Sequence, residues 1–252
     1  MKNFKPLGEI FSSAWKQFEK NWGNYVGLSA IFTVAQFVII FVVVFSMVFL
    51  QLAGIFGSIP LMINQDSTTA GFGGMIMIIT VITTSLLLFI AVFGLSFLIN
   101  AWLMRTMITL IAKKQSGSLD FVQFIKSCWP KVWRVFFAMI LMMLIIFVGF
   151  ICFIIPGIIF GLWLSQVLFL IILEDLSISD AFKKSKELVS GHIGTVFLYN
   201  FVFMLVMEVG LMAINIIPFL GTLAMPVLSI VMIPLMTIFQ YHIFLELKKL
   251  NG

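Results

Sequence analysis

The stretch Val132–Leu173, VWRVFFAMILMMLIIFVGFICFIIPGIIFGLWLSQVLFLIIL, decides the fold class. It holds a single charge, Arg134, and its apolar run is about twice the ~20 residues that one helix needs to cross a bilayer. Ile155-Pro156-Gly157 divides the run, because proline interrupts a helix and glycine permits a tight turn. The pattern predicts two membrane spans, Val132–Ile154 and Ile158–Leu173, joined by a turn at Pro156 and Gly157.

The composition of the whole chain agrees with a membrane location. Of 252 residues, 62% are hydrophobic and only 10% are charged, and the mean hydropathy is +1.19. Soluble domains have about 45–50% apolar and about 25% charged residues. So much apolar surface cannot be hidden inside one soluble globule. The composition therefore excludes a cytosolic enzyme, a secreted disulfide scaffold and a nucleic-acid-binding protein.

Four further spans follow from the same reasoning. They are Tyr25–Leu50, Met75–Met104, Ile193–Ile216 and Thr222–Leu245, with helical propensity continuing to Ala112 after the second. Gly54, Gly57, Pro60 and the stretch Asn64–Gly74 are expected to form an outer loop, and Ile217–Gly221, which contains Pro218 and Gly221, a tight outer turn. The sequence thus predicts an all-α integral membrane protein with six transmembrane helices arranged as three hairpins.

The charges predict how these spans are oriented. The net charge is +5, from 15 Lys and Arg and 10 Asp and Glu, and in the six-span interpretation all the basic residues lie on one side. Cytoplasmic loops carry such an excess and attract anionic lipid headgroups. We expect a multi-pass protein of the cell (inner or cytoplasmic) membrane with both termini cytoplasmic. No cleavable signal peptide is expected, because a polar amphipathic stretch follows Lys2 and Lys5.

An internal repeat is predicted ahead of the first, third and fifth spans. When Glu9, Asp120 and Asp180 are aligned, apolar or small residues coincide on one face of a 3.6-residue helix. This apolar face includes Phe11 and Phe18, Val122 and Trp129, and Phe182 and Val189. We interpret each segment as an amphipathic helix in the cytoplasmic headgroup layer that precedes a hairpin. The alternative is that any helix next to a membrane looks like this. The repeat units of the single membrane domain 1–252 are approximately 6–115, 116–175 and 176–252.

Polar residues inside the predicted spans are candidates for function. They include Gln36, Asn100, Asn200 and Glu208, together with Gln166, Asn215 and Gln240. Amides commonly join helices by hydrogen bonds. A carboxylate in hydrocarbon is costly, so Glu208 is either functional or paired with an amide, and we expect it to point into the bundle.

Catalytic chemistry has no clear signature in the sequence. There is no HExxH, GxSxG, CxxC or Walker motif, and we assign no catalytic, cofactor-binding or metal-binding residue and no cofactor. His192 and His242 could approach each other but lack an evident acid partner. Glu174 and Asp175 are expected to be solvated at a helix end, and Cys128 and Cys152 to be unpaired thiols.

A family resemblance rests on Ile155–Val189, IPGIIFGLWLSQVLFLIILEDLSISDAFKKSKELV, with similar ends in LGEIFSSAWKQFEKNW and IFQYHIFLELKKL. The stretch resembles a prokaryotic family named after the membrane domain of glycerophosphodiester phosphodiesterases, with the YciC-like proteins as relatives. The matching positions are Pro156, Gly157, Glu174, Ala181, Ser185, Leu188 and Gly191. The resemblance implies the fold and a membrane location. It implies no activity, because the phosphodiesterase chemistry of the founding members belongs to a separate soluble domain.

Two functions fit these observations best. The first is a non-catalytic membrane protein that organises lipid or a partner protein through the cytoplasmic helices; anionic lipid, a protein partner or a second copy of the chain would be the partners, and nucleic acid would not. The alternative is a transporter or permease-like subunit with a polar route near Glu208. An intramembrane enzyme ranks last, because catalytic groups are missing.

Overall fold

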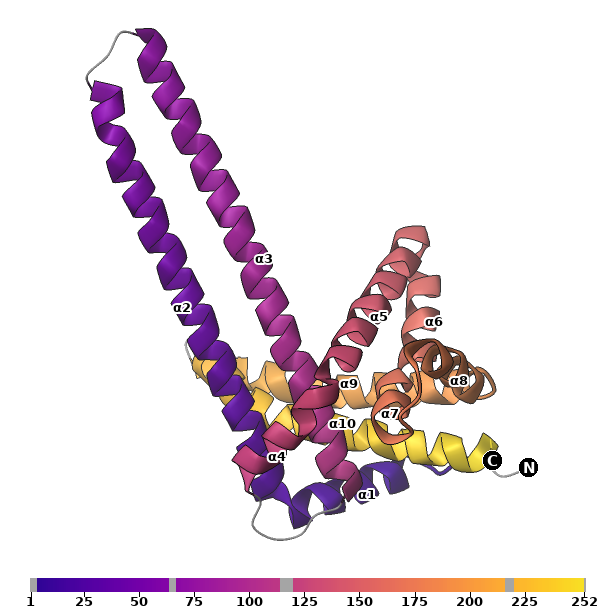
Figure 1. Ribbon diagram of the computed structural model, residues 1–252. Helices are drawn as coiled ribbons and strands as arrows, with labels where there is room; N and C mark the ends of the chain where they lie inside the picture. The colour runs from indigo at the N-terminus through magenta and orange to yellow at the C-terminus, as the bar shows by residue number, and fades with distance from the viewer. Residues whose placement is uncertain (1–3, 64–66, 114–119, 216–219, 252) are drawn as a thin grey trace. The chain divides into compact units, whose positions relative to one another are not determined.

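The computed structural model describes residues 4–63, 67–113, 120–215 and 220–251, and these residues form helices with no strand among them (Figure 1). In chain order the helices are α1 (Leu7–Lys20), α2 (Trp22–Ile63), α3 (Ser67–Lys113), α4 (Phe121–Cys128), the 3₁₀ turn η1 (Trp129–Lys131), α5 (Val132–Cys152), α6 (Ile154–Leu164), α7 (Val167–Leu173), α8 (Ile178–Ser190), α9 (Ile193–Asn215) and α10 (Leu220–Asn251). Six helical segments are long and apolar enough to cross a membrane, as expected of a multi-pass membrane protein.

Two of the three short helices that precede α2, α5 and α9 begin at a capping side chain. Asp120 caps α4, because its side chain accepts a hydrogen bond from the Gln123 backbone N–H. Ser177 caps α8 by accepting from the Asp180 N–H, and its hydroxyl donates to the Asp180 carboxylate. Pro130 falls in η1, where the chain leaves α4 and enters α5.

The first pair of long helices extends further than predicted. α2 continues through Gly54, Gly57 and Pro60, and α3 already begins at Ser67. The predicted outer loop is therefore wrong for the residues that the structure describes. An isolated glycine costs a helix only about 1 kcal/mol, which the apolar residues around it can offset. Residues 64–66 lie outside the described part of the chain.

The division between the third and fourth spans lies at Phe153 rather than at Ile155-Pro156-Gly157. α5 ends at Cys152, Phe153 is extended, and α6 begins at Ile154, so Pro156 and Gly157 belong to a helix. Proline is tolerated in a first helical turn, where its missing N–H has no intrahelical acceptor. Gly157 has a different role: a Cβ there would lie 2.6 Å from the Phe150 ring, so glycine lets α6 approach α5.

The fourth span is interrupted where a single helix was predicted. α6 ends at Leu164 and α7 begins at Val167, with a turn at Ser165 and Gln166. Ser185 of α8 satisfies the backbone at this break. Its hydroxyl donates to the Trp163 carbonyl at 2.6 Å and accepts from the Gln166 N–H at 3.3 Å. A neighbouring helix thus supplies the hydrogen bonds that the interrupted span lacks.

The last two long helices agree with the predicted spans at most of their ends. α9 covers Ile193–Asn215, and α10 starts at Leu220 and continues beyond the predicted end to Asn251. Gly221 is inside α10 and not in a turn, which corrects its predicted role. Pro218 lies outside the described residues.

Two compact units make up the chain, and we describe them separately. The larger unit consists of Met1–Thr33 and Asn100–Gly252, and the hairpin unit is Val34–Ile99. The larger unit has a buried core that draws on every helix it contains, with fully buried Leu28, Ile111, Leu170 and Phe239 among its members. Within it α1 packs along α10, α5 against α6, and α8 against both α6 and α7.

The hairpin unit has no such core. None of its described side chains is buried, and both of its helical arms are apolar. The arm Val34–Phe56 is about 23 residues long, or roughly 34 Å at ~1.5 Å per residue, close to the ~30 Å hydrocarbon thickness of a bilayer. The partly buried positions Ile39, Val43 and Ser46 on this arm recur every three or four residues, so they share one face of the helix.

Candidate functional site

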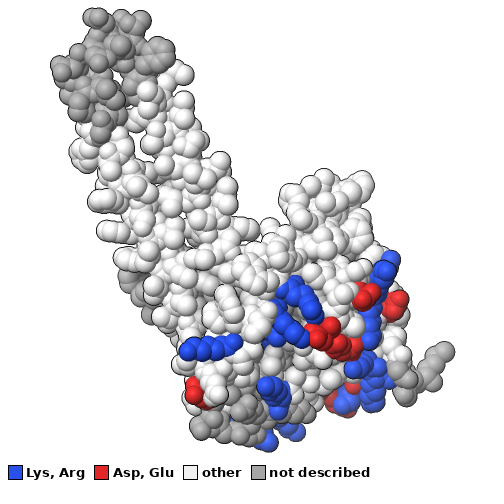
Figure 2. Space-filling model, in the orientation of Figure 1, with Lys and Arg blue, Asp and Glu red and all other residues white. Residues whose placement is uncertain are grey.

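The charged side chains belong almost entirely to the larger unit. Every Lys and Arg that the structure describes lies in this unit, on α1, α4, η1, α8, the first turn of α5, the chain just before α1 and the last turns of α3 and α10. Figure 2 shows the charges of the visible face gathered away from the tip of the α5–α6 pair, which is uncharged. We call the part of the larger unit that carries these lysines and arginines its charged end. It is the part of the protein most suited to contact anionic groups.

The apolar face of α1 contacts protein. Ile10, Ala14 and Phe18 are buried, and α1 packs along α10. Phe18 was expected to face lipid, and this position is corrected. Only 8% of Phe18 is exposed, because α10 packs along α1. Phe11, at the edge of the same face, stays 37% exposed, and Lys16 lies on the exposed side.

The predicted lipid-facing residues beside α5 and those of α8 have different surroundings. On α4 the buried residues are Phe124 and Cys128, whereas Val122 of α4 and Trp129 of η1 are exposed. Val122 and Trp129 therefore remain accessible, and their lipid-facing side stays a prediction. On α8 Val189 is buried, which corrects its lipid-facing placement, and Phe182 is partly buried.

A cluster of ion pairs surrounds Glu174 and Asp175 at the end of α7. Glu174 contacts Lys184 of α8 at 2.6 Å and Lys248 of α10 at 2.9 Å. Asp175 contacts Lys131 at 2.6 Å and Arg134 at 2.8 Å, and its φ of 54° turns the chain from α7 towards α8. The prediction that both acids are solvated is wrong for Glu174, whose side chain is only 16% exposed, and holds for Asp175, whose side chain is 57% exposed. Through these ion pairs the two acids connect η1, α5, α8 and α10.

The lysine and arginine partners lower the pKa of both carboxyls. For Glu174, partial burial acts to raise the pKa, but the hydrogen bonds and charges of Lys184 and Lys248 outweigh it, so the pKa lies below its usual value. For Asp175, the hydrogen bond from Lys131 has the largest effect and lowers the pKa. Both acids are consequently ionised at neutral pH and have no role as proton donors there.

The two histidines have different neighbours. His242 of α10 lies 3.0 Å from Gln17 Oε1, and the amide of Gln17 donates to the Ile111 carbonyl at 3.0 Å. His192 lies edge-on to Phe4, with ring centroids 5.8 Å apart. Gln17 thus joins α1, the end of α3 and α10. This arrangement holds three helices together.

The polar residues of the predicted spans have separate surroundings. Gln240 donates from its amide to the Asn200 side-chain oxygen, which joins α9 and α10. Glu208 is exposed on α9, and no hydrogen bond or ion pair connects it to another described residue, so the expectation that it points into the bundle is wrong. Gln36 is partly buried in the hairpin unit, and Asn100 is exposed in the larger unit.

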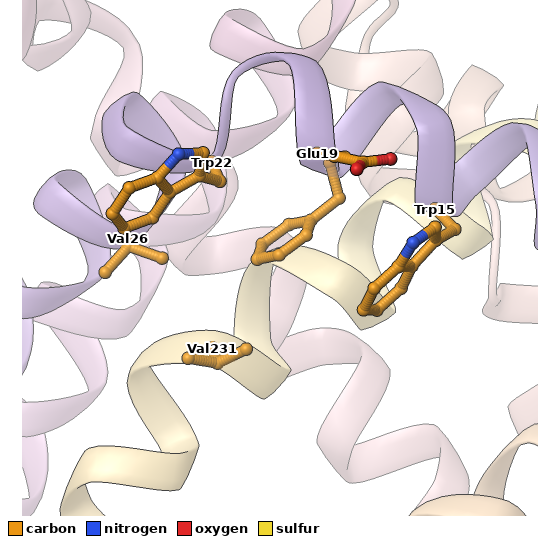
Figure 3. A pocket seen from close by; sticks show the side chains of 6 residues that line it. Trp15, Glu19, Trp22, Val26 and Val231 are labelled. Atoms are coloured by element: carbon orange, nitrogen blue, oxygen red, sulfur yellow. The ribbon is translucent and has the colours of Figure 1, made fainter.

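Two apolar grooves lie beside α1. The elbow groove is bounded by Trp15, Phe18, Glu19, Trp22, Val26 and Val231, and its volume is about 260 Å³. Figure 3 shows Trp15 and Trp22 on either side of Glu19, with Val231 of α10 opposite them. The second groove, also about 260 Å³, is bounded by Leu7, Gly8, Phe11, Val202, Phe203, Val206 and Phe239. Such walls suit hydrocarbon.

Several residues that matter in the structure went unnoticed in the sequence. Gln17 and Ser185 look like ordinary polar positions of surface helices, and Gln51 donates to Ser85 at 2.7 Å within the hairpin unit. Ser185 belongs to the pattern that carries the family resemblance, which was the only signal for it. In the part of the chain that the structure describes, no three His, Cys, Asp or Glu side chains are grouped to hold a metal ion.

Comparisons with protein-family models, with curated proteins and with solved structures found no match. What the protein does therefore has to follow from the chemistry of its own residues. That chemistry consists of a charged end, a hairpin unit with no described charge and two apolar grooves.

Proposed function

We propose that this protein is a non-catalytic multi-pass protein of the cell membrane that organises lipid, or a partner protein, through a cytoplasmic face built on α1, α4 and α8. The observation that carries the proposal is the separation of charge: the described lysines and arginines lie in the larger unit, and the hairpin unit has no described charge. Basic residues beside a membrane attract anionic lipid, at about 1 kcal/mol each.

Several features support the finer parts of this proposal. Each of α1, α4 and α8 directly precedes a long apolar segment, which is consistent with three repeats of a surface helix and a hairpin. The basic residues at the ends of α3 and α10 are consistent with both termini in the cytoplasm. We also infer a relationship to the family named after the phosphodiesterase membrane domain. The exposed position of Glu208 gives no support to a transport route there.

Retained lipid tests the proposed function. The full chain would be purified in mild detergent, and bound lipid counted by native mass spectrometry. We expect phosphatidylglycerol to be retained, and the triple substitution Lys5→Gln, Lys126→Gln and Lys183→Gln to reduce its occupancy at least about tenfold, since three such lysines contribute about 3 kcal/mol. The matched triple Arg variant keeps the charges and should retain the lipid. Equal retention by all three proteins would contradict the proposal.

Cysteine labelling tests the orientation. In a background without Cys128 and Cys152, Ser67→Cys should react with an impermeant maleimide added outside the cell, and Ser116→Cys should not. The reverse pattern would place both termini outside. Reaction at both positions would contradict the six-span topology.

A further inference from the structure

The elbow groove combines an apolar interior with a rim formed by two tryptophans and one carboxylate. Its walls come from α1, the first turns of α2, and Val231 of α10, and all the surfaces that face its interior are apolar. Trp15 and Trp22 flank its opening and remain 45% and 60% exposed. Tryptophan favours such boundaries, because its ring is apolar and its N–H remains available to polar groups.

Glu19 gives the rim a negative charge. Its side chain is exposed, its stem borders the groove, and Figure 3 shows its carboxylate on the α1 side, outside the apolar interior. Among the described residues no Lys or Arg forms an ion pair with it, although Glu174 and Asp175 each have two basic partners. The carboxylate is thus available to a cationic ligand.

The rim and the interior together select one kind of occupant. A carboxylate between exposed indole rings attracts an organic cation through charge and through the ring faces. An anionic headgroup would be repelled by Glu19. A primary ammonium fits better than a quaternary one, because it can donate a hydrogen bond to the carboxylate. A free amine would leave the apolar interior unfilled.

We propose that the elbow groove binds a membrane phospholipid whose headgroup carries a primary ammonium, with one acyl chain between Phe18, Trp22 and Val231 and the ammonium at Glu19. The inference rests on the proposed function, because it assumes that this end of the protein meets the membrane surface. It goes further by naming one site and one lipid class. The anionic lipids attracted by the lysines would bind elsewhere on the charged end.

Photo-cross-linking tests this site with the full chain in vesicles. The probe is phosphatidylethanolamine with a diazirine in one acyl chain, and the comparison lipids are phosphatidylglycerol and phosphatidylcholine with the same chain. Labelled peptides are mapped by mass spectrometry. We expect the ethanolamine lipid to label the peptide around Trp15–Val26 about fivefold more than either comparison lipid, the ratio that about 1 kcal/mol provides.

Three variants sharpen the test. Glu19→Gln should remove the preference for the ethanolamine lipid, whereas Glu187→Gln, a matched change of an exposed acid on α8, should leave it unchanged. Val231→Trp should fill the groove and reduce labelling there by all three lipids. Equal labelling by the three lipids in the natural chain, or a preference that survives Glu19→Gln, would overturn the inference.

The outcomes separate this inference from the proposed function. If phosphatidylglycerol is retained through the lysines but phosphatidylethanolamine does not label the elbow groove, the proposed function stands and the inference fails. If neither lipid is retained or cross-linked, both fail. Labelling at the elbow groove without lysine-dependent retention would support the site and contradict the anionic-lipid role.

Discussion

The hairpin unit and the larger unit solve the problem of apolar side chains in opposite ways. In the hairpin unit no described residue is buried, although its helices belong to the second and third most apolar of the six candidate spans in the described chain. In the larger unit α1, α4 and α8 each bury part of their apolar residues, and most of their charged residues are exposed. Lipid can cover the first, whereas the second needs its own core. High hydropathy alone therefore does not tell which solvent a helix meets.

A charge in the middle of the hairpin unit should have the largest effect. Phe45 is 66% exposed and lies at the centre of the arm Val34–Phe56. Arginine at the centre of a membrane helix costs about 2.5–3.5 kcal/mol, so Phe45→Arg should block insertion of the hairpin. Extraction of membranes with alkaline carbonate would measure this. Two controls should insert normally: Phe45→Leu, and Ser12→Arg on the exposed side of α1. If the Phe45→Arg protein also inserted normally, lipid would not surround this arm.

Two leucines of one helix compare the units directly. Leu28 and Leu52 both belong to α2, but Leu28 is fully buried in the larger unit and Leu52 is 47% exposed in the hairpin unit. Leu28→Ala should lower the free energy of unfolding by about 2–5 kcal/mol, because it leaves a cavity. Leu52→Ala should cost less than about 1 kcal/mol, because lipid occupies the vacated space. Unfolding in mixed detergent micelles measures both, and equal losses would remove the distinction between the units.

The ion pairs of Glu174 should make the larger unit sensitive to acid. Since Lys184 and Lys248 lower the pKa of this carboxyl in the folded protein, its contribution is fully present above about pH 4.5 and is lost as the pH falls through the lowered value. Glu174→Gln should therefore cost about 1 kcal/mol at neutral pH, with the difference from the natural chain shrinking in acid. Thermal unfolding between pH 3 and pH 8 tests this, with Glu187→Gln as the control. A difference that does not change with pH would exclude the ion pairs as its cause.

The sequence predicted the parts of the fold that depend on local composition. Apolar length gave the six candidate spans, and the short helices before α2, α5 and α9 were expected from their periodicity and their acidic first turns. Pro156 was misinterpreted, because a proline that ends one helix and a proline in the first turn of the next look alike in sequence. The predicted outer loop was wrong for a related reason. Gly54 and Gly57 do not end α2, because the residues around them favour a helix.

The candidate site was less predictable, because it depends on contacts between distant segments. Glu174 meets Lys248 of a later helix, Gln17 meets His242 across most of the chain, and no local pattern indicates either pair. The direction of each apolar face was also ambiguous. Phe18 and Val189 have the spacing of a lipid-facing stripe, but the same spacing suits packing against another helix.

The smallest expected effect concerns a side-chain hydrogen bond between the arms of the hairpin unit. Gln51 of α2 donates to the Ser85 hydroxyl of α3 at 2.7 Å. Such bonds between membrane helices contribute about 0.6 kcal/mol on average, because the separated helices also find hydrogen-bond partners. A double-mutant cycle with Gln51→Leu and Ser85→Ala should therefore give a coupling energy of about 0.6 kcal/mol. The separation of the arms in micelles would be followed by energy transfer between dyes on α2 and α3. A coupling above about 2 kcal/mol would indicate that polar contacts hold the two arms of the hairpin unit together. A coupling of zero would indicate that contacts between their apolar residues are sufficient.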